Sequence, residues 1–75
     1  MNNERRKQIR QWIKQAEVLK SNLENILWDE QNYYDNIPEN LQSSSRAEDS
    51  EASIECLEEA IDIIGEAIDK ADEAI

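Results

Sequence analysis

The side chains of this sequence that could do chemistry are almost all carboxylates. Its 75 residues include 18 Asp and Glu, eight Lys and Arg, one cysteine and no histidine. Paired carboxylates can act as general acid and base, or bind a metal ion. The densest set recurs at helical spacing in the last third of the chain and consists of Glu58, Glu59, Asp62, Glu66 and Asp69. A row of this kind is usually a solvated helix face, which favours solubility over catalysis.

The sequence lacks the partner residues that catalytic and metal sites require. A di-iron site in a helical bundle needs Glu-x-x-His motifs, and the chain has no histidine. Residues 62–73 lack the alternating oxygen ligands and central glycine of a calcium-binding loop. Cys56 has neither a histidine to activate it nor a second cysteine to pair with. We therefore predict no catalytic residue, no cofactor and no metal site, and a protein that is not an enzyme.

The charge is distributed unevenly along the chain. Residues 1–20 carry six basic and two acidic side chains, a net charge of +4, whereas residues 21–75 carry two basic and sixteen acidic ones, a net charge of −14. This balance repels nucleic acid and anionic membrane and favours a basic partner. The longest apolar run is Ile26–Trp28, far short of a membrane span. With a lone thiol, these features predict a cytoplasmic protein that binds neither nucleic acid nor membrane directly.

The first half of the chain has the spacing of an a/d heptad, with steps of three and four residues between apolar positions. These positions are Ile9, Trp12, Ala16, Leu19, Leu23, Ile26, Tyr33 and Ile37, with a polar gap at Glu30. Ile13, Leu27 and Tyr34 directly follow d positions and widen the stripe on one side. The spacing predicts a helix over residues 4–35. Pro38 disfavours helical geometry in the residue before it, so we expect the helix to end near Asn36, a residue type that tolerates the left-handed conformation at a helix C-terminus.

A second helix is predicted over residues 46–74, after a turn at residues 36–45. Ser45-Arg46-Ala47-Glu48 has the pattern of a capping box, in which Ser45 is the N-cap. The apolar residues that follow have the same spacing and are Ile54, Leu57, Ile61, Ile64, Ile68, Ala71 and Ile75. Gly65 interrupts this helix, either as a point of close backbone approach or as a tolerated defect.

Folding the chain at the turn predicts a single all-α domain over residues 1–75, an antiparallel two-helix hairpin of coiled-coil type. In the expected register Trp12 faces Ile68, and Glu30 faces Ser50 in a polar layer that Arg46 or Ser53 could join. The basic start of one helix then lies beside the acidic end of the other, which favours antiparallel pairing. Because both apolar stripes are wide and so short a chain buries little surface, we expect two hairpins to dimerise into a four-helix bundle.

The turn carries a resemblance to a known group of proteins. Tyr33–Ser43 reads YYDNIPENLQS and precedes a helix rich in Ala, Glu and Ile. It resembles a widespread group of small phage and prophage proteins in which a Pro-Glu-Asn-Leu-Gln-Ser-like turn joins two acidic helices. The similarity covers about residues 24–64 and leaves out the basic residues 1–20. It implies a phage-encoded accessory protein of the bacterial cytoplasm and, by analogy, an inhibitor of a host defence system.

The leading functional hypothesis is therefore a protein-binding module that docks onto a host protein. Trp28 lies outside the predicted seam, where an exposed aromatic side chain marks a contact surface unless a second protomer covers it. The predicted partner-binding residues are Trp28, Tyr34, Glu24, Asp29 and Asp35. One alternative is a nucleic-acid mimic whose carboxylates block a basic DNA- or RNA-binding groove. The other is a purely structural oligomerisation element.

Overall fold

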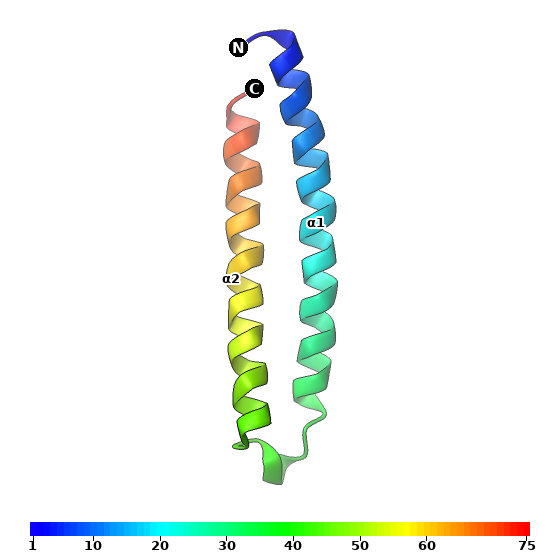
Figure 1. Ribbon diagram of the computed structural model, residues 1–75, viewed down its shortest axis with the longest axis vertical. Helices are drawn as coiled ribbons and strands as arrows, with labels where there is room; N and C mark the ends of the chain where they lie inside the picture. Colours follow the sequence, from blue (N-terminus) through cyan, green and yellow to red (C-terminus); the bar gives the residue numbers. More distant parts are fainter.

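The computed structural model describes all 75 residues as two long antiparallel helices joined by a tight turn (Figure 1). Helix α1 spans Asn3–Asp35, the 3-10 turn η1 spans Glu39–Leu41, and helix α2 spans Ser45–Glu73. The hairpin measures 59 × 15 × 12 Å, and its two termini lie at the same end. The all-α hairpin predicted from the sequence is confirmed, and each predicted helix boundary agrees with the observed one to within one residue.

The start of α2 differs from the prediction by one residue. Ser44, not Ser45, is the N-cap, and its hydroxyl oxygen accepts a 3.3 Å hydrogen bond from the Ala47 backbone N–H. Ser44 has the extended backbone that an N-cap requires, whereas Ser45 is already inside the helix. Three consecutive serines make the cap ambiguous in the sequence, and the conformation of the turn selects among them.

Helix α1 ends where predicted, with Asn36 as its C-cap, but Asn36 does not adopt a left-handed conformation. Asn36 has φ −90° and ψ −2°, a right-handed conformation, and no residue of the chain has positive φ. Its side-chain Nδ2 donates a 2.8 Å hydrogen bond to the Asn32 carbonyl oxygen. Gln42 Nε2 donates a 2.9 Å bond to the Ile37 carbonyl oxygen across the turn. The first of these bonds satisfies a carbonyl group in the last turn of α1, and the second satisfies one in the loop that follows it.

The seam between the helices uses only half of the stripe predicted for α1. Every seventh residue from Ile9 to Ile37 faces α2 as expected, and on α2 the half-buried apolar residues are those predicted, together with Ala60. Beside this row, the half-buried residues of α1 are not those at the predicted d positions but Ile13, Leu27 and Tyr34, which were predicted to widen the stripe, together with Lys20. The residues predicted at the d positions, Trp12, Leu19, Ile26 and Tyr33, are between 44% and 58% exposed, so Trp12 is not buried against Ile68 as expected.

Contacts from Lys20 and Tyr34 accompany this choice of row. The two rows of α1 flank the same central residues, so steps of three and four residues fit either of them. The Lys20 side chain lies along α2 with its Cε 3.7 Å from the position that a Cβ would have at Gly65. The Tyr34 hydroxyl donates a 2.8 Å hydrogen bond to the Glu51 carboxylate of α2. Helix α2 thus packs on the side of α1 that carries the aliphatic part of the Lys20 side chain and the Tyr34 hydroxyl.

The predicted polar layer is present in a simpler form. The Ser50 hydroxyl donates a 2.8 Å hydrogen bond to Glu30 Oε1. The prediction allowed either Arg46 or Ser53 as a third member, and neither makes a hydrogen bond to this pair. The two ion pairs of the chain, Lys20–Glu24 at 3.9 Å and Lys70–Glu73 at 3.0 Å, each lie within one helix. The opposite charges at the open end therefore act at longer range rather than through bridges between the helices.

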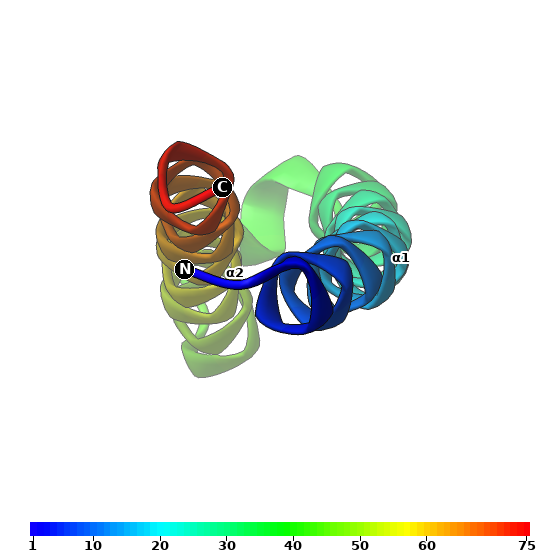
Figure 2. The same cartoon turned by 90° about the horizontal axis from the view of Figure 1, so that it is seen from above.

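The hairpin encloses almost no core. Only four residues are buried (Ala16, Ile37, Ala47 and Ser50), and none of the large side chains is fully buried. Seen along the helices, α1 and α2 lie side by side in a single layer, so most of each helix faces outward (Figure 2). Neither helix contains a stretch apolar enough to span a lipid bilayer. The large apolar side chains outside the seam therefore form exposed surfaces.

Candidate protein-interaction surfaces

Trp28 lies on the outward face of α1. Glu30 faces α2, where it accepts a hydrogen bond from Ser50. Trp28 precedes Glu30 by two residues, so its side chain is rotated about 200° around the helix axis relative to Glu30. The indole therefore points away from α2, and Trp28 is 64% exposed. Asp35 follows two turns later on the same side and is also exposed. We call the surface formed by Trp28, Glu24 and Asp35 the Trp28 face.

The structure brings together only some of the predicted partner-binding residues. Glu24 lies one turn before Trp28, with its carboxylate 3.9 Å from the Lys20 ammonium. Asp29 is exposed but projects about 100° away from its neighbour Trp28. Tyr34 is half-buried at the border with α2, where its hydroxyl is bonded to Glu51. Glu24 and Asp35 therefore accompany Trp28, whereas Asp29 and Tyr34 lie on other sides of the helix.

The bond to Glu51 has an electrostatic consequence. The hydrogen bond favours the neutral phenol of Tyr34 and raises the pKa of that hydroxyl above its usual 10.0. Partial loss of solvent and the negative charges of Glu51 and Asp35 raise this pKa further. A phenolate at this position would face the Glu51 carboxylate without a proton between them. Tyr34 therefore acts as a neutral hydrogen-bond donor that links the two helices.

A second apolar surface runs along α1 and consists of Trp12, Leu19, Ile26 and Tyr33, which we call the α1 stripe. These side chains are between 44% and 58% exposed. They repeat every seven residues, which is the period of a coiled coil, so all four side chains lie on the same side of α1. The distance from Trp12 to Tyr33 is about 32 Å at 1.5 Å per residue. The stripe is thus a continuous apolar row in which about half of each side chain remains exposed to solvent.

Small residues of α2 lie beside the α1 stripe. Tyr33 and Arg46 line the same pocket, which places them on one side of the hairpin. Every seventh residue after Arg46 shares its side of α2, and these residues are Ser53, Ala60, Ala67 and Ala74. The contacts of Lys20 with Gly65 and of Tyr34 with Glu51 lie on the opposite side. One side of the hairpin therefore combines a row of large apolar residues with a row of small ones.

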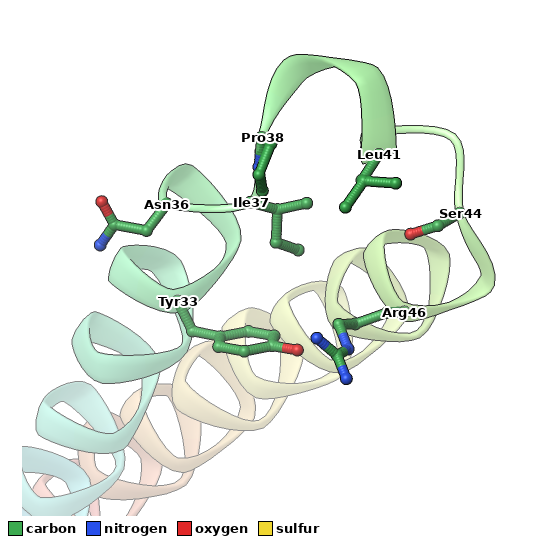
Figure 3. Close-up of a pocket in the computed structure, with 7 residues that line it drawn as sticks. All are labelled: Tyr33, Asn36, Ile37, Pro38, Leu41, Ser44 and Arg46. Carbon is green, nitrogen blue, oxygen red and sulfur yellow. The ribbon is translucent and has the colours of Figure 1, made fainter.

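The α1 stripe ends in a pocket of about 490 Å³, which we call the loop pocket. Its lining residues come from the end of α1, the turn and the start of α2, and are Tyr33, Asn36, Ile37, Pro38, Leu41, Ser44 and Arg46. Figure 3 shows the Tyr33 ring extending toward the Arg46 side chain, with Ile37 and Leu41 pointing into the space between them. Arg46 makes no ion pair within the hairpin. The pocket thus combines apolar walls from Ile37, Pro38 and Leu41 with polar residues and one cation that has no ion-pair partner.

The carboxylates of α2 are solvated. All eleven are exposed, and only Glu73 has a cation within 4.0 Å. No group of three or more His, Cys, Asp or Glu side chains is arranged to hold a metal ion. Glu58 and Asp62 thus lie on an exposed, negatively charged surface, and of the α2 carboxylates only Asp69 lines a cavity, one of about 420 Å³ shared with Lys20. Cys56 is also exposed.

Heptad counting assigned the α1 stripe to the interior of the hairpin, and it gave no indication of the loop pocket. The only signal in the sequence was the width of the apolar stripe, which exceeds what one neighbouring helix can cover. No family model, curated protein or solved structure matches this chain.

Proposed function

We propose that this chain is a small protein-binding module that docks onto another protein through the Trp28 face. The observation that carries the proposal is the outward-pointing indole of Trp28, 64% exposed on a helix whose other side already packs against α2. Large aromatic side chains at the centre of an interface often contribute about 2 kcal/mol or more to binding. A tryptophan that is this exposed and points away from α2 is therefore suited to a contact with a partner.

The charge around Trp28 favours a basic partner. Glu24 and Asp35 flank the indole, and Asp29 adds a negative charge on the next side of the helix. Such carboxylates accelerate association with a positively charged surface more than they add affinity. A host protein that is itself basic or binds nucleic acid fits this chemistry. The resemblance to small acidic phage proteins supports the role of an inhibitor or regulator of a host defence protein in the bacterial cytoplasm.

We also propose that two hairpins associate into a four-helix bundle. The hairpin alone has four buried residues and no fully buried large side chain, which is little for a stable domain. Dimerisation through another side of the hairpin leaves the Trp28 face free, so self-association and partner binding are compatible. Mass measurement by sedimentation at micromolar concentration tests the dimer, and a cooperatively folded monomer contradicts it.

A second candidate function rests on the acidic surface of α2. Ten of its eleven exposed carboxylates have no cation nearby, so the row could occupy a basic groove in place of nucleic-acid phosphates. Binding by mimicry depends on charge and weakens steeply with salt, whereas docking through an indole does not. The two functions therefore differ in which residues matter and in their response to ionic strength.

One experiment separates these functions. The tagged chain is used to capture host proteins from bacterial lysate, captured proteins are identified by mass spectrometry, and the affinity of each is then measured for variants. We expect Trp28→Ala to weaken binding at least about tenfold, or 1.4 kcal/mol, and the charge reversal Glu59→Lys/Asp62→Lys/Glu66→Lys to weaken it less. The opposite ranking favours mimicry. A chain that dimerises and captures no host protein is a structural oligomerisation element.

A further inference from the structure

The hairpin exposes more surface than a compact protein of the same mass does. A compact protein of 8.7 kDa exposes about 4,700 Å², whereas this chain exposes 5,809 Å². Its radius of gyration is 17.3 Å, against about 11 Å for a compact chain of this length. The excess of roughly 1,100 Å² is similar to the roughly 800 Å² that each partner buries in a standard protein interface. Covering one face of the hairpin with a second copy would remove this excess.

The α1 stripe has the symmetry that such an interface requires. A two-fold interface brings the same patch of both copies together. The stripe is symmetric about a point between Asn22 and Leu23, so in an antiparallel pair Trp12 lies opposite the second copy's Tyr33, and Leu19 lies opposite its Ile26. The row is about 32 Å long, and only a helix of similar length can cover it. The α1 helix of a second copy meets both conditions.

The same arrangement brings Trp12 to the loop pocket of the second copy. Tyr33 lines that pocket, and its other apolar walls are Ile37, Pro38 and Leu41. Pockets of roughly 300–1,000 Å³ enclose small ligands, so a pocket of about 490 Å³ accommodates an indole ring. Arg46 at its edge makes no ion pair in the hairpin and can stack on the face of an incoming tryptophan. Each dimer would contain two such contacts.

Charge selects the antiparallel arrangement over the parallel one. Residues 1–20 have a net charge of +4. Residues 60–75 contain five acidic residues and one basic residue, a net charge of −4, so the open end of the hairpin is nearly neutral. Residues 21–59 have eleven acidic residues and one basic, a net charge of −10. A parallel dimer would place two strongly negative loop ends together, whereas an antiparallel dimer places each beside the basic first turns of α1.

We infer that two copies of this chain pair antiparallel through their α1 stripes, with Trp12 of each copy inserted into the loop pocket of the other. The inference rests on the dimerisation proposed above and names the surface and the direction of that contact. The row of small residues on α2, which includes Ala60 and Ala67, lies beside the stripe and lets the two hairpins approach closely. The Trp28 face stays outside this interface.

The first test compares two adjacent exposed residues of α1. Leu19 is 58% exposed in the stripe, and Val18 is 60% exposed about 100° away from it. We expect Leu19→Glu to weaken dimerisation at least about 100-fold, because it places a carboxylate of each copy in the apolar contact. Val18→Glu should change it less than about threefold. Sedimentation equilibrium measures the dimer, and circular dichroism shows whether each variant keeps its helices.

The second test uses disulfide formation to read the direction of pairing, in a Cys56→Ser background. Gln15 and Asp29 are exposed, border the stripe, and lie about 21 Å apart along the helix. In the antiparallel dimer residue 15 of one copy lies near residue 29 of the other. An equimolar mixture of Gln15→Cys and Asp29→Cys should therefore form the mixed disulfide under mild oxidation. Disulfides between identical variants would show a parallel dimer and overturn the inference.

The outcomes separate this inference from the proposal on which it rests. A wild-type chain that stays monomeric contradicts both. A wild-type dimer that is unaffected by Leu19→Glu keeps the bundle and overturns the surface named here. A dimer that Leu19→Glu dissociates, but that Trp12→Ala weakens no more than Trp28→Ala does, overturns the insertion of Trp12. We expect Trp12→Ala to weaken the dimer at least about tenfold and Trp28→Ala less than about threefold.

Discussion

Tyr34 on α1 donates a 2.8 Å hydrogen bond to the Glu51 carboxylate on α2, and this is one of two side-chain hydrogen bonds that join the helices. The bond raises the pKa of the tyrosine hydroxyl, which means that the folded state holds this proton more tightly than the unfolded state does. The stabilisation is therefore fully present below pH 10, the usual pKa of the group, and is lost as the pH rises through the raised value.

This relationship predicts a pH-dependent difference between the wild type and Tyr34→Phe. Below pH 10 the wild type should have the larger free energy of unfolding, and the difference should disappear in more alkaline solution. Urea unfolding followed by circular dichroism across this range measures it. Tyr33→Phe is the control, because the Tyr33 hydroxyl makes no hydrogen bond within the hairpin. An equal pH dependence in both variants would show that the bond to Glu51 does not stabilise the fold.

The polar layer of Glu30 and Ser50 should lower stability and supply specificity. We expect the double change Glu30→Leu/Ser50→Ala to raise the free energy of unfolding by about 1 kcal/mol or more, because an apolar pair replaces a partly buried carboxylate and its donor. The same change should leave the register or oligomeric state less defined. Chemical denaturation measures the first effect and sedimentation the second. Severe destabilisation by Glu30→Leu alone would contradict this account of the layer.

Gly65 is not required by close packing. The side-chain atoms nearest to the position that a Cβ would take at this residue are Cε and Nζ of Lys20, both at 3.7 Å, which is ordinary van der Waals contact. Gly65→Ala should therefore raise the free energy of unfolding by up to about 1 kcal/mol, the difference in helix propensity between the two residues. The reverse change Ala67→Gly, at an exposed position of the same helix, should lower it by a similar amount. Destabilisation by Gly65→Ala would show that close approach at this glycine matters.

The two adjacent serines at the start of α2 should differ in their contribution to stability. Ser44→Ala removes the hydroxyl that accepts from the Ala47 N–H and should lower the free energy of unfolding by about 1 kcal/mol. Ser45→Ala lies inside the first turn and should change it by less than about 0.5 kcal/mol. Urea unfolding of both variants measures the difference. A larger loss at Ser45 would restore the cap that the capping-box pattern predicts.

The two tryptophans provide separate fluorescence signals for the dimer. In Trp28→Phe only Trp12 emits, and its emission should shift to longer wavelength when dilution dissociates the dimer and exposes the indole. In Trp12→Phe only Trp28 emits, and its spectrum should not change over the same dilution. A shift confined to Trp28 would place the dimer contact on the outward face of α1.

Periodicity and local chemistry were enough to predict the two helices and their antiparallel pairing. Steps of three and four residues between apolar positions define a helix, and Pro38 ends the first one because its ring excludes helical geometry before it. The pairing of Glu30 with Ser50 could also be predicted, since each is the polar residue of its own apolar row. These conclusions depend on neighbouring residues and on spacing, both of which can be read along the chain.

The side of α1 that meets α2 could be learned only from the folded hairpin. Rows at Trp12 and at Ile13 flank the same central residues, and a hydrophobic period cannot distinguish them. The choice depends on contacts between residues far apart in the chain, such as Lys20 with Gly65 and Tyr34 with Glu51. With α2 packed on that side of α1, the α1 stripe stays exposed. The surface available to a partner therefore follows from the packing of the whole hairpin and not from the pattern of either helix.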